Sequence, residues 1–440
     1  MTAASDRVLR GRLVWFADEP RIAGAAALRY VEDGAILIEK GIIAGVGEAS
    51  EILAKAPADI AIDDHTGKLI SPGFIDTHIH YPQSRVIASY GAQLLEWLHK
   101  YVFVEEQKLR DPRHADIVAR FFLDELTRCG TTTAMVYCTV HPESVDAFFA
   151  ESERRDMRMI AGKVMMDRNA PEALRDDPQR GYDESKALMA RWRGRGRLDY
   201  AVTPRFAVTS SEAQLEAAGA LARENPQAFV QTHLSENHAE IAFVKELFAW
   251  TRTYLQVYER YGLLGPRSVF GHCIHLEPSE IAALAQTRSV AAFCPTSNLF
   301  LGSGLFDMRG LQENSVRVSL ATDVGGGTSY SMLQTAAEGY KALQLRGQSW
   351  PAAQAFYQMT LGNARALGLE DRIGSLEAGM EADIVVLDSR ATPAMAHRME
   401  SVQGDINEEL FILMMMGDDR AVSETYVAGR PAKSGRGEIR

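Results

Sequence analysis

Five side chains that can bind a metal ion stand at the ends of four short apolar runs. His78 and His80 close the first run, and His233, His272 and Asp323 close three later ones. In extended backbone, residues two apart point to the same face, so both His78 and His80 can be aimed at one place. Three or four imidazoles and one carboxylate form a donor set suited to Zn²⁺ or Fe²⁺. This pattern predicts a divalent metal site that activates water for hydrolysis.

A single His-x-His pair would be weak evidence, because pairs of surface or core histidines are common. Five metal-capable residues at the ends of four different runs are a much stronger signal. The active sites of parallel β/α barrels lie at the C-terminal ends of the strands, which is where these residues fall.

The middle of the chain alternates short apolar strands with longer helical segments. About eight such repeats within roughly 300 residues are typical of a closed (β/α)₈ barrel, an α/β fold. An open doubly wound sheet is the alternative, but the chain has no GxGxxG fingerprint and no GK[ST] loop to support it. The predicted strands span residues 74–77, 132–137, 158–165, 199–204, 228–232, 268–271, 290–293 and 317–322.

Both ends of the chain have a different, β-rich texture. Short β-type runs occur at residues 12–16, 35–39 and 42–46, and again at 383–387 and 423–427. We expect the two ends to meet in one small β-sandwich beside the barrel. The predicted division is 1–70 for the first half of the sandwich, 71–373 for the barrel, and 374–440 for the second half with the C-terminal segment.

Composition limits the possible partners. The chain has 440 residues, 46 % of them hydrophobic and 24 % charged, with a net charge of −11. This acidic balance argues against nucleic acid or an anionic membrane as the main partner, and favours a small-molecule substrate. Four cysteines without CxxC spacing and an N-terminus without an apolar stretch predict a cytoplasmic enzyme. The apolar run Leu410–Met416 could be a packed helix or part of a homodimer contact, and core packing is favoured.

Several longer motifs resemble a known family. The segments PGFIDTHIH, QTHLSEN, GHCIHL and LATD resemble the amidohydrolase superfamily over essentially the whole predicted barrel. The resemblance is closer still to its guanine deaminases, in HYPQ from His80, LLEWLHKYVFVEEQKL from Leu94, GKVMMDRN, PRF, HLSEN and TDVGGGTS. It implies that His78, His80, His233 and Asp323 are the metal ligands and that His272 lies beside the metal. It also implies the joint terminal sandwich.

The end of the fourth strand bears on the number of metal ions. The binuclear branch of this superfamily bridges two metals with a carboxylated lysine there, whereas this chain has Thr203-Pro204-Arg205-Phe206. Lys163 lies within the third predicted strand and is interpreted as structural or salt-bridging. One metal ion per chain is therefore expected. The separate zinc deaminase fold needs a PCxxC motif, and Cys294-Pro295 does not begin one.

The remaining predicted roles concern catalysis and substrate. We expect Glu236 to transfer protons to and from the ring, Asp323 to take the proton of the attacking water, and His272 to stabilise the developing oxyanion. Gln83, Arg205 and Phe206 would recognise the base, and three glycines after Asp323 would permit a tight turn beside it. The full predicted substrate-binding set is His80, Gln83, Arg205, Phe206, His233, Glu236 and Asp323.

Hydrolysis of guanine to xanthine and ammonia is the function that this resemblance implies. Another aminohydrolase of the superfamily, acting on cytosine, an adenosine-type substrate or a triazine, is the first alternative. A catalytically inactive barrel that serves as a scaffold is the second, and the retention of every metal-capable residue together with Glu236 argues against it.

Overall fold

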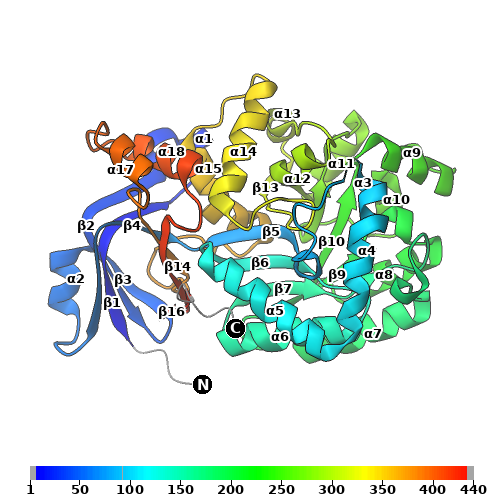
Figure 1. Ribbon diagram of the computed structural model, residues 1–440, viewed down its shortest axis with the longest axis horizontal. Helices are drawn as coiled ribbons and strands as arrows, with labels where there is room; N and C mark the ends of the chain where they lie inside the picture. Colours follow the sequence, from blue (N-terminus) through cyan, green and yellow to red (C-terminus); the bar gives the residue numbers. More distant parts are fainter. Residues whose placement is uncertain (1–5, 92, 434–440) are drawn as a thin grey trace.

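The computed structural model describes residues 6–91 and 93–433, and a barrel of parallel strands forms its centre (Figure 1). Nearly every residue of these strands is buried, as expected for strands covered on both faces. The predicted barrel is confirmed. Its strands are β5 Phe74–His80, β6 Thr131–Tyr137, β7 Arg158–Gly162, β9 Asp199–Pro204, β10 Phe229–Leu234, β11 Ser268–His272, β12 Val290–Phe293 and β13 Arg317–Leu320.

The hydrogen-bonded ladder follows chain order from β5 to β13, with the two-residue strand β8 (Val164–Met165) paired to β9. Between β13 and β5, side-chain hydrogen bonds take the place of the ladder: Thr77 Oγ1 donates to Ser319 Oγ at 2.8 Å, and Asn363 binds both strands. Asn363 Nδ2 donates to the carbonyl oxygens of Ile75, at 2.6 Å, and Leu320, at 2.7 Å. Its Oδ1 accepts from the amide of Leu320 at 2.9 Å. This amide therefore joins the first and last strands of the barrel.

Helices cover the outside of the barrel. Helix α5 illustrates the local rules: the Asp111 side chain caps its first turn, Pro112 occupies the first helical position, and one face is buried. The main helices of the barrel are α5 Pro112–Arg128, α6 Pro142–Arg155, α7 Pro178–Trp192, α8 Glu212–Glu224, α9 His238–Leu247, α10 Leu255–Arg260, α11 Pro278–Thr287, α12 Pro295–Phe300, α13 Met308–Glu313, α14 Met332–Leu345, α15 Ala352–Tyr357 and α16 Asn363–Leu367.

A helical segment between β5 and α5 deviates from this regular pattern. It consists of α3 (Leu94–Trp97), a π-helical stretch (Leu98–Val102) and α4 (Phe103–Glu106), which follow one another without a break. Its apolar side chains Leu94, Trp97 and Leu98 are buried. The segment carries part of the pocket described below.

The two ends of the chain meet in a second sheet, as expected (Figure 1). Its seven strands have the order β16-β15-β14-β4-β1-β2-β3, so strands from the C-terminal part pair with strands from the N-terminal part. Strand β14 pairs antiparallel with β4, which joins the two parts. The strands are β1 Arg7–Phe16, β2 Leu28–Glu39, β3 Ile42–Glu48, β4 Ala61–Pro72, β14 Ile384–Leu387, β15 Val422–Val427 and β16 Arg430–Pro431.

Helix α18 (Ile406–Met416) contains the apolar run whose packing was in question. Leu410, Ile412, Leu413 and Met414 are buried, whereas Met416 is 39 % exposed. Core packing therefore accounts for most of the run. Within residues 6–91 and 93–433, no helix is long and apolar enough to span a bilayer.

Candidate metal and substrate site

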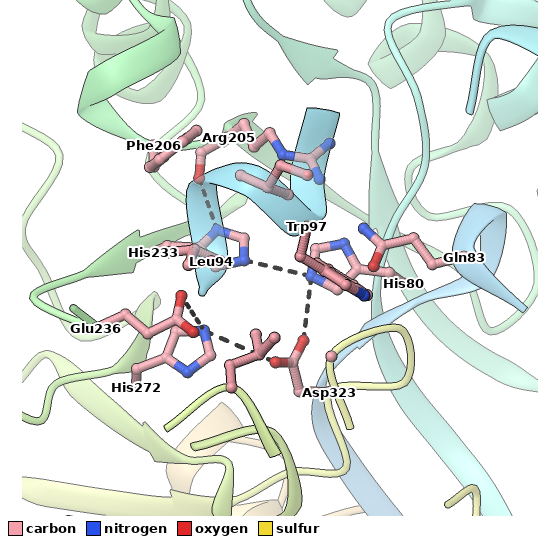
Figure 2. A pocket seen from close by; sticks show the side chains of 13 residues that line it. His80, Gln83, Leu94, Trp97, Arg205, Phe206, His233, Glu236, His272 and Asp323 are labelled. Carbon is pink, nitrogen blue, oxygen red and sulfur yellow. Dashed lines mark hydrogen bonds and ion pairs between the residues drawn. The ribbon is translucent and has the colours of Figure 1, made fainter. Parts of the chain in front are cut away.

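The five metal-capable side chains converge at the C-terminal ends of four barrel strands. Figure 2 shows four of them, His80, His233, His272 and Asp323. Asp323 Oδ1 lies 3.3 Å from His80 Nε2 and 3.4 Å from His78 Nε2. His233 Nε2 lies 3.3 Å from His80 Nε2, and His272 Nε2 lies 3.8 Å from Asp323 Oδ2. The structure thus brings together residues up to about 250 positions apart, as the strand-end argument predicts.

Asp323 reaches the cluster from a backbone that few residues adopt. Strand β13 ends at Leu320, two residues earlier than predicted, and Asp323 follows with φ = 51°. His272 has φ = 70°. Left-handed backbone is unfavourable for side-chain-bearing residues and is concentrated at functional sites. The Asp323 amide donates to the His78 carbonyl at 2.9 Å, which holds the two segments together.

Two of the imidazoles are oriented by hydrogen bonds at Nδ1, the ring nitrogen that faces away from the cluster. His233 Nδ1 lies 2.7 Å from the Arg205 carbonyl oxygen, so Nδ1 carries the proton and Nε2 presents its lone pair to the cluster. His272 Nδ1 lies 2.9 Å from Asn298 Oδ1 and is oriented in the same way. Such outer partners are typical of histidines that bind metal ions.

The protonation states also favour metal binding. Burial lowers the pKa of His80 to about 3, and burial with the nearby His78 and His80 holds the pKa of His233 well below its usual value. Burial alone would raise the pKa of Asp323, but the adjacent His78 and His80 outweigh it and hold that pKa well below its usual range. Neutral imidazoles and an ionised carboxylate are the forms that coordinate a cation.

His78 gives the clearest sign that a metal ion fits this site. It is fully buried, and neither of its ring nitrogens forms a hydrogen bond with a residue that the structure describes. A Cβ atom at Gly271 would come within 2.5 Å of His78 Cε1, so only glycine leaves room for this ring. Buried polar atoms normally have partners, so a missing partner is implied here.

The grouping of the ligand atoms differs in one respect from the predicted ligand set. One atom from each of His78, His233, His272 and Asp323 lies within 4.8 Å of the others, and these four could hold a metal ion. His80 is not part of that group, although it contacts Asp323 and His233. The resemblance had assigned His80 as a ligand and His272 as its neighbour, and that assignment stays a prediction.

Glu236 faces the cluster from the loop after β10. Its Oε2 lies 3.4 Å from His272 Nε2, and its Oε1 accepts a hydrogen bond from Ser303 Oγ at 3.2 Å. Burial, reinforced by the negative charge of Asp323, raises the pKa of Glu236 to about 8. Glu240 Oε2 accepts from the Glu236 amide at 2.9 Å and so holds this loop in place.

A pocket opens above the cluster (Figure 2), with about 390 Å³ of space that includes open solvent at its mouth. The predicted recognition residues Gln83, Arg205 and Phe206 all line it, and the glycines after Asp323 border it at Gly326. The neighbouring Gly325 is required for close approach, because a Cβ there would come within 1.8 Å of Gln83 Oε1. The complete lining is His80, Gln83, Leu94, Trp97, Leu98, Arg205, Phe206, His233, Glu236, His272, Leu301, Asp323 and Gly326.

Sequence reasoning missed two kinds of contributor to this pocket. The first is its apolar wall, Leu94, Trp97 and Leu98, which comes from the helical segment before α5. The second is Glu106, which pairs with Arg205 and accepts a hydrogen bond from Gln83. A possible signal was the acidic pair Glu105-Glu106 within an otherwise apolar stretch, because buried carboxylates need partners.

Lys163 lies apart from the pocket lining. It is fully buried, forms a short ion pair with Asp176, and lies 3.4 Å from Glu184 on α7. These contacts agree with the structural, salt-bridging interpretation.

Comparison with known proteins places this fold and site in one class. The family model described as "Amidohydrolase family" matches residues 69–432. The chain belongs to the amidohydrolase family.

Its relatives are more specific. The chain is 50 % identical to a guanine deaminase of Escherichia coli over 406 residues, 92 % of each chain, and 41 % identical to a probable guanine deaminase of Deinococcus radiodurans over 92 % of this chain and 93 % of that one. The solved structure of the E. coli protein superposes with a TM-score of 0.94 at 48 % identity, covering 97 % of this chain and 99 % of that one. A Clostridium acetobutylicum guanine deaminase with bound guanine in its active site has a TM-score of 0.86 at 26 % identity, over the same shares of the two chains.

Proposed function

We propose that this protein hydrolyses guanine to xanthine and ammonia, using one divalent metal ion per chain, Zn²⁺ or Fe²⁺. The observation that carries the proposal is the arrangement of the pocket. His80, His233, His272, Asp323 and Glu236 line the same pocket as Gln83 and Arg205. The similarity to guanine deaminases over most of the chain supports the choice of substrate.

The metal ion would be held by His78, His80, His233 and Asp323, with His272 beside it. The unpartnered His78 and the lowered pKa values of His80 and His233 support this assignment. When bound, a divalent metal lowers the pKa of water so that hydroxide is available at neutral pH. The described lining of the pocket has no lysine, and Lys163 pairs with Asp176 instead, which supports one metal ion rather than two.

Glu236 would serve as the proton carrier of the reaction. Its raised pKa keeps the carboxyl protonated near neutral pH, so it can donate a proton to the ring nitrogen next to the carbon under attack. The ionised carboxylate can then take the proton that remains on the attacking oxygen and pass it to the departing amine, which leaves as ammonia as the new carbonyl forms. The loop is held by Glu240 and Ser303, so the carboxyl needs little rearrangement before each transfer.

Asp323 and His272 would serve the attacking water. Asp323 is held ionised, so it can accept the proton that the water loses. His272 Nε2 lies 3.4 Å from Glu236 Oε2 and 3.8 Å from Asp323 Oδ2, and when this nitrogen also carries a proton it would stabilise negative charge on the attacking oxygen.

Gln83, Arg205 and Phe206 would select the base. Arg205 offers donors to a ring carbonyl, and the Gln83 amide offers its oxygen as an acceptor to the adjoining edge. Phe206 and Trp97 supply flat apolar surface against the rings.

The test is ammonia release from guanine, adenine and cytosine, each supplied alone to metal-replete protein, with metal content determined on the same sample. We expect turnover of guanine, with adenine and cytosine poorer by about 10⁴-fold. Preference for adenine or cytosine would contradict the substrate assignment, and absence of turnover with all three would favour a scaffold role. Two metal ions per chain would contradict the mononuclear assignment.

A further inference from the structure

One buried carboxylate joins the two side chains that line the recognition edge of the pocket. Glu106 on α4 is 1 % exposed. Its Oε1 accepts from Gln83 Nε2 at 3.0 Å and from Arg205 Nη1 at 2.9 Å, and its Oε2 lies 2.7 Å from the same Nη1. Gln83 and Arg205 line the cavity, whereas Glu106 does not. Glu106 is therefore placed to act on a ligand through its two partners.

The contact with Glu106 determines which way the Gln83 amide faces. The oxygen and nitrogen of a glutamine amide have nearly the same shape, so their orientation is decided by hydrogen-bond partners. An ionised carboxylate can only accept, so it requires the NH₂ group of Gln83 on its side. The Gln83 oxygen is then turned away from Glu106 and lies close to Gly325. It remains an acceptor at the edge of the pocket.

The same carboxylate holds the guanidinium of Arg205. Only Nη1 is bound to Glu106, so the other guanidinium nitrogens remain available as donors. The guanidinium carbon lies 5.5 Å from the centre of the Phe103 ring, which limits its movement on a second side. The negative charge of Glu106 also compensates a buried cation that would otherwise attract anions.

We propose that Glu106 is a positioning residue that sets the hydrogen-bonding pattern of the pocket as one donor, from Arg205, beside one acceptor, from Gln83. This pattern fits a purine that presents a ring carbonyl next to a ring N–H. It opposes a purine that presents an amine next to an unprotonated ring nitrogen. The class of ligand in this inference rests on the proposed function. The inference adds that a residue outside the pocket lining determines which purine is preferred.

Binding of two purines with opposite hydrogen-bonding groups on the same edge tests this role. The measurement does not require turnover of guanine. Hypoxanthine carries the carbonyl and the N–H, whereas adenine carries an amine and a bare nitrogen at the same positions. We would measure both dissociation constants by calorimetry on the metal-loaded protein. The wild type is expected to bind hypoxanthine tighter by at least about tenfold, since hydrogen bonds to charged groups are among the stronger ones.

Glu106→Gln keeps the size of the side chain. The glutamine amide can donate a hydrogen bond to Gln83 as well as accept one. The Gln83 amide can then turn, and the hypoxanthine-to-adenine preference is expected to fall to within about threefold. Glu106→Asp keeps the carboxylate and should retain the preference even where both affinities weaken. Glu105→Gln is the matched control, because this neighbouring glutamate is also buried but pairs with Lys108 and Arg85.

An unchanged preference in Glu106→Gln, or an equal loss in Glu105→Gln, would overturn the proposal. Should Glu106→Gln fail to fold, Gln83→Met tests the same pattern by removing the acceptor, and retention of the preference there would also overturn it. Guanine turnover by the wild type is assayed separately. If guanine is not hydrolysed but the preference follows Glu106, the proposed function fails and the role of Glu106 stands.

Discussion

The barrel contains two buried clusters of ionisable groups. They differ in whether their polar atoms have hydrogen-bond or ion-pair partners. At the mouth, His78 is left without a hydrogen-bond partner among the described residues, and burial together with the nearby imidazoles lowers the pKa of His233. Near the end of β7, Lys163 is equally buried but pairs with Asp176 and lies close to Glu184. Both clusters place charge in the interior, which is costly unless partners compensate.

This difference separates a binding site from a structural ion pair. A buried cluster whose polar atoms all have partners gains no new interaction from a ligand. A cluster with unpartnered polar atoms gains partners when a cation binds. Buried charge alone does not identify function. Buried polar atoms without a partner do identify a binding site, because their burial costs free energy that a bound ligand can recover.

The largest effect is expected on removing the carboxylate at the mouth. Asp323→Asn should abolish turnover and lower the metal content, because it removes both a ligand charge and the acceptor for the proton of water. Turnover and metal content measured on the same preparation check this. Lys163→Met is the control and should keep its metal. Retention of full metal and activity in Asp323→Asn would show that the site has been misassigned.

A smaller loss is expected for the proton carrier. Glu236→Gln keeps the shape of the side chain and removes its ability to transfer protons. Turnover should fall by roughly 10²–10⁴-fold while metal and substrate still bind. Steady-state kinetics with metal analysis test this, and turnover near the wild-type rate would remove Glu236 from the mechanism.

His80 and His272 make a matched pair at the mouth. The resemblance makes His80 a metal ligand and His272 its neighbour, whereas the group of closely spaced ligand atoms contains His272 and not His80. We expect His80→Ala to lose most of the metal. His272→Ala should retain most of it and lose roughly 10–100-fold in turnover, the usual cost of a group that supports a metal site from outside. Metal occupancy in the two variants decides the matter, and the reverse result would exchange their roles.

The smallest effect on activity is expected at Lys163. Lys163→Met leaves Asp176 buried with less compensation, and loss of one partner of a buried pair costs about 3–5 kcal/mol of stability. Turnover at a temperature where the variant is folded should stay within about threefold of wild type. Replacing Asp176 by leucine in the same chain should recover part of the stability. Loss of metal in Lys163→Met would show that the two clusters are not separate.

Much of this arrangement could be predicted from the sequence because it depends on short-range rules. Strand alternation and buried β-type runs located the barrel strands to within a few residues. The placement of His78, His233 and Asp323 near strand ends then followed from the geometry of parallel barrels. The meeting of the two chain ends was likewise predictable, because neither β-rich end could bury its apolar face alone.

Tertiary structure decided what depends on contacts between distant segments. The Glu106 carboxylate meets Gln83 across 23 positions and Arg205 across 99, and no spacing rule predicts such a pairing. Asn363 joins the first and last strands because its amide can both donate and accept where the ladder is interrupted. The left-handed backbone at Asp323 is held by the His78 carbonyl rather than by local preference. Sequence thus determined which side chains could bind a metal ion, and the closed barrel determined which atoms they present and which partners they lack.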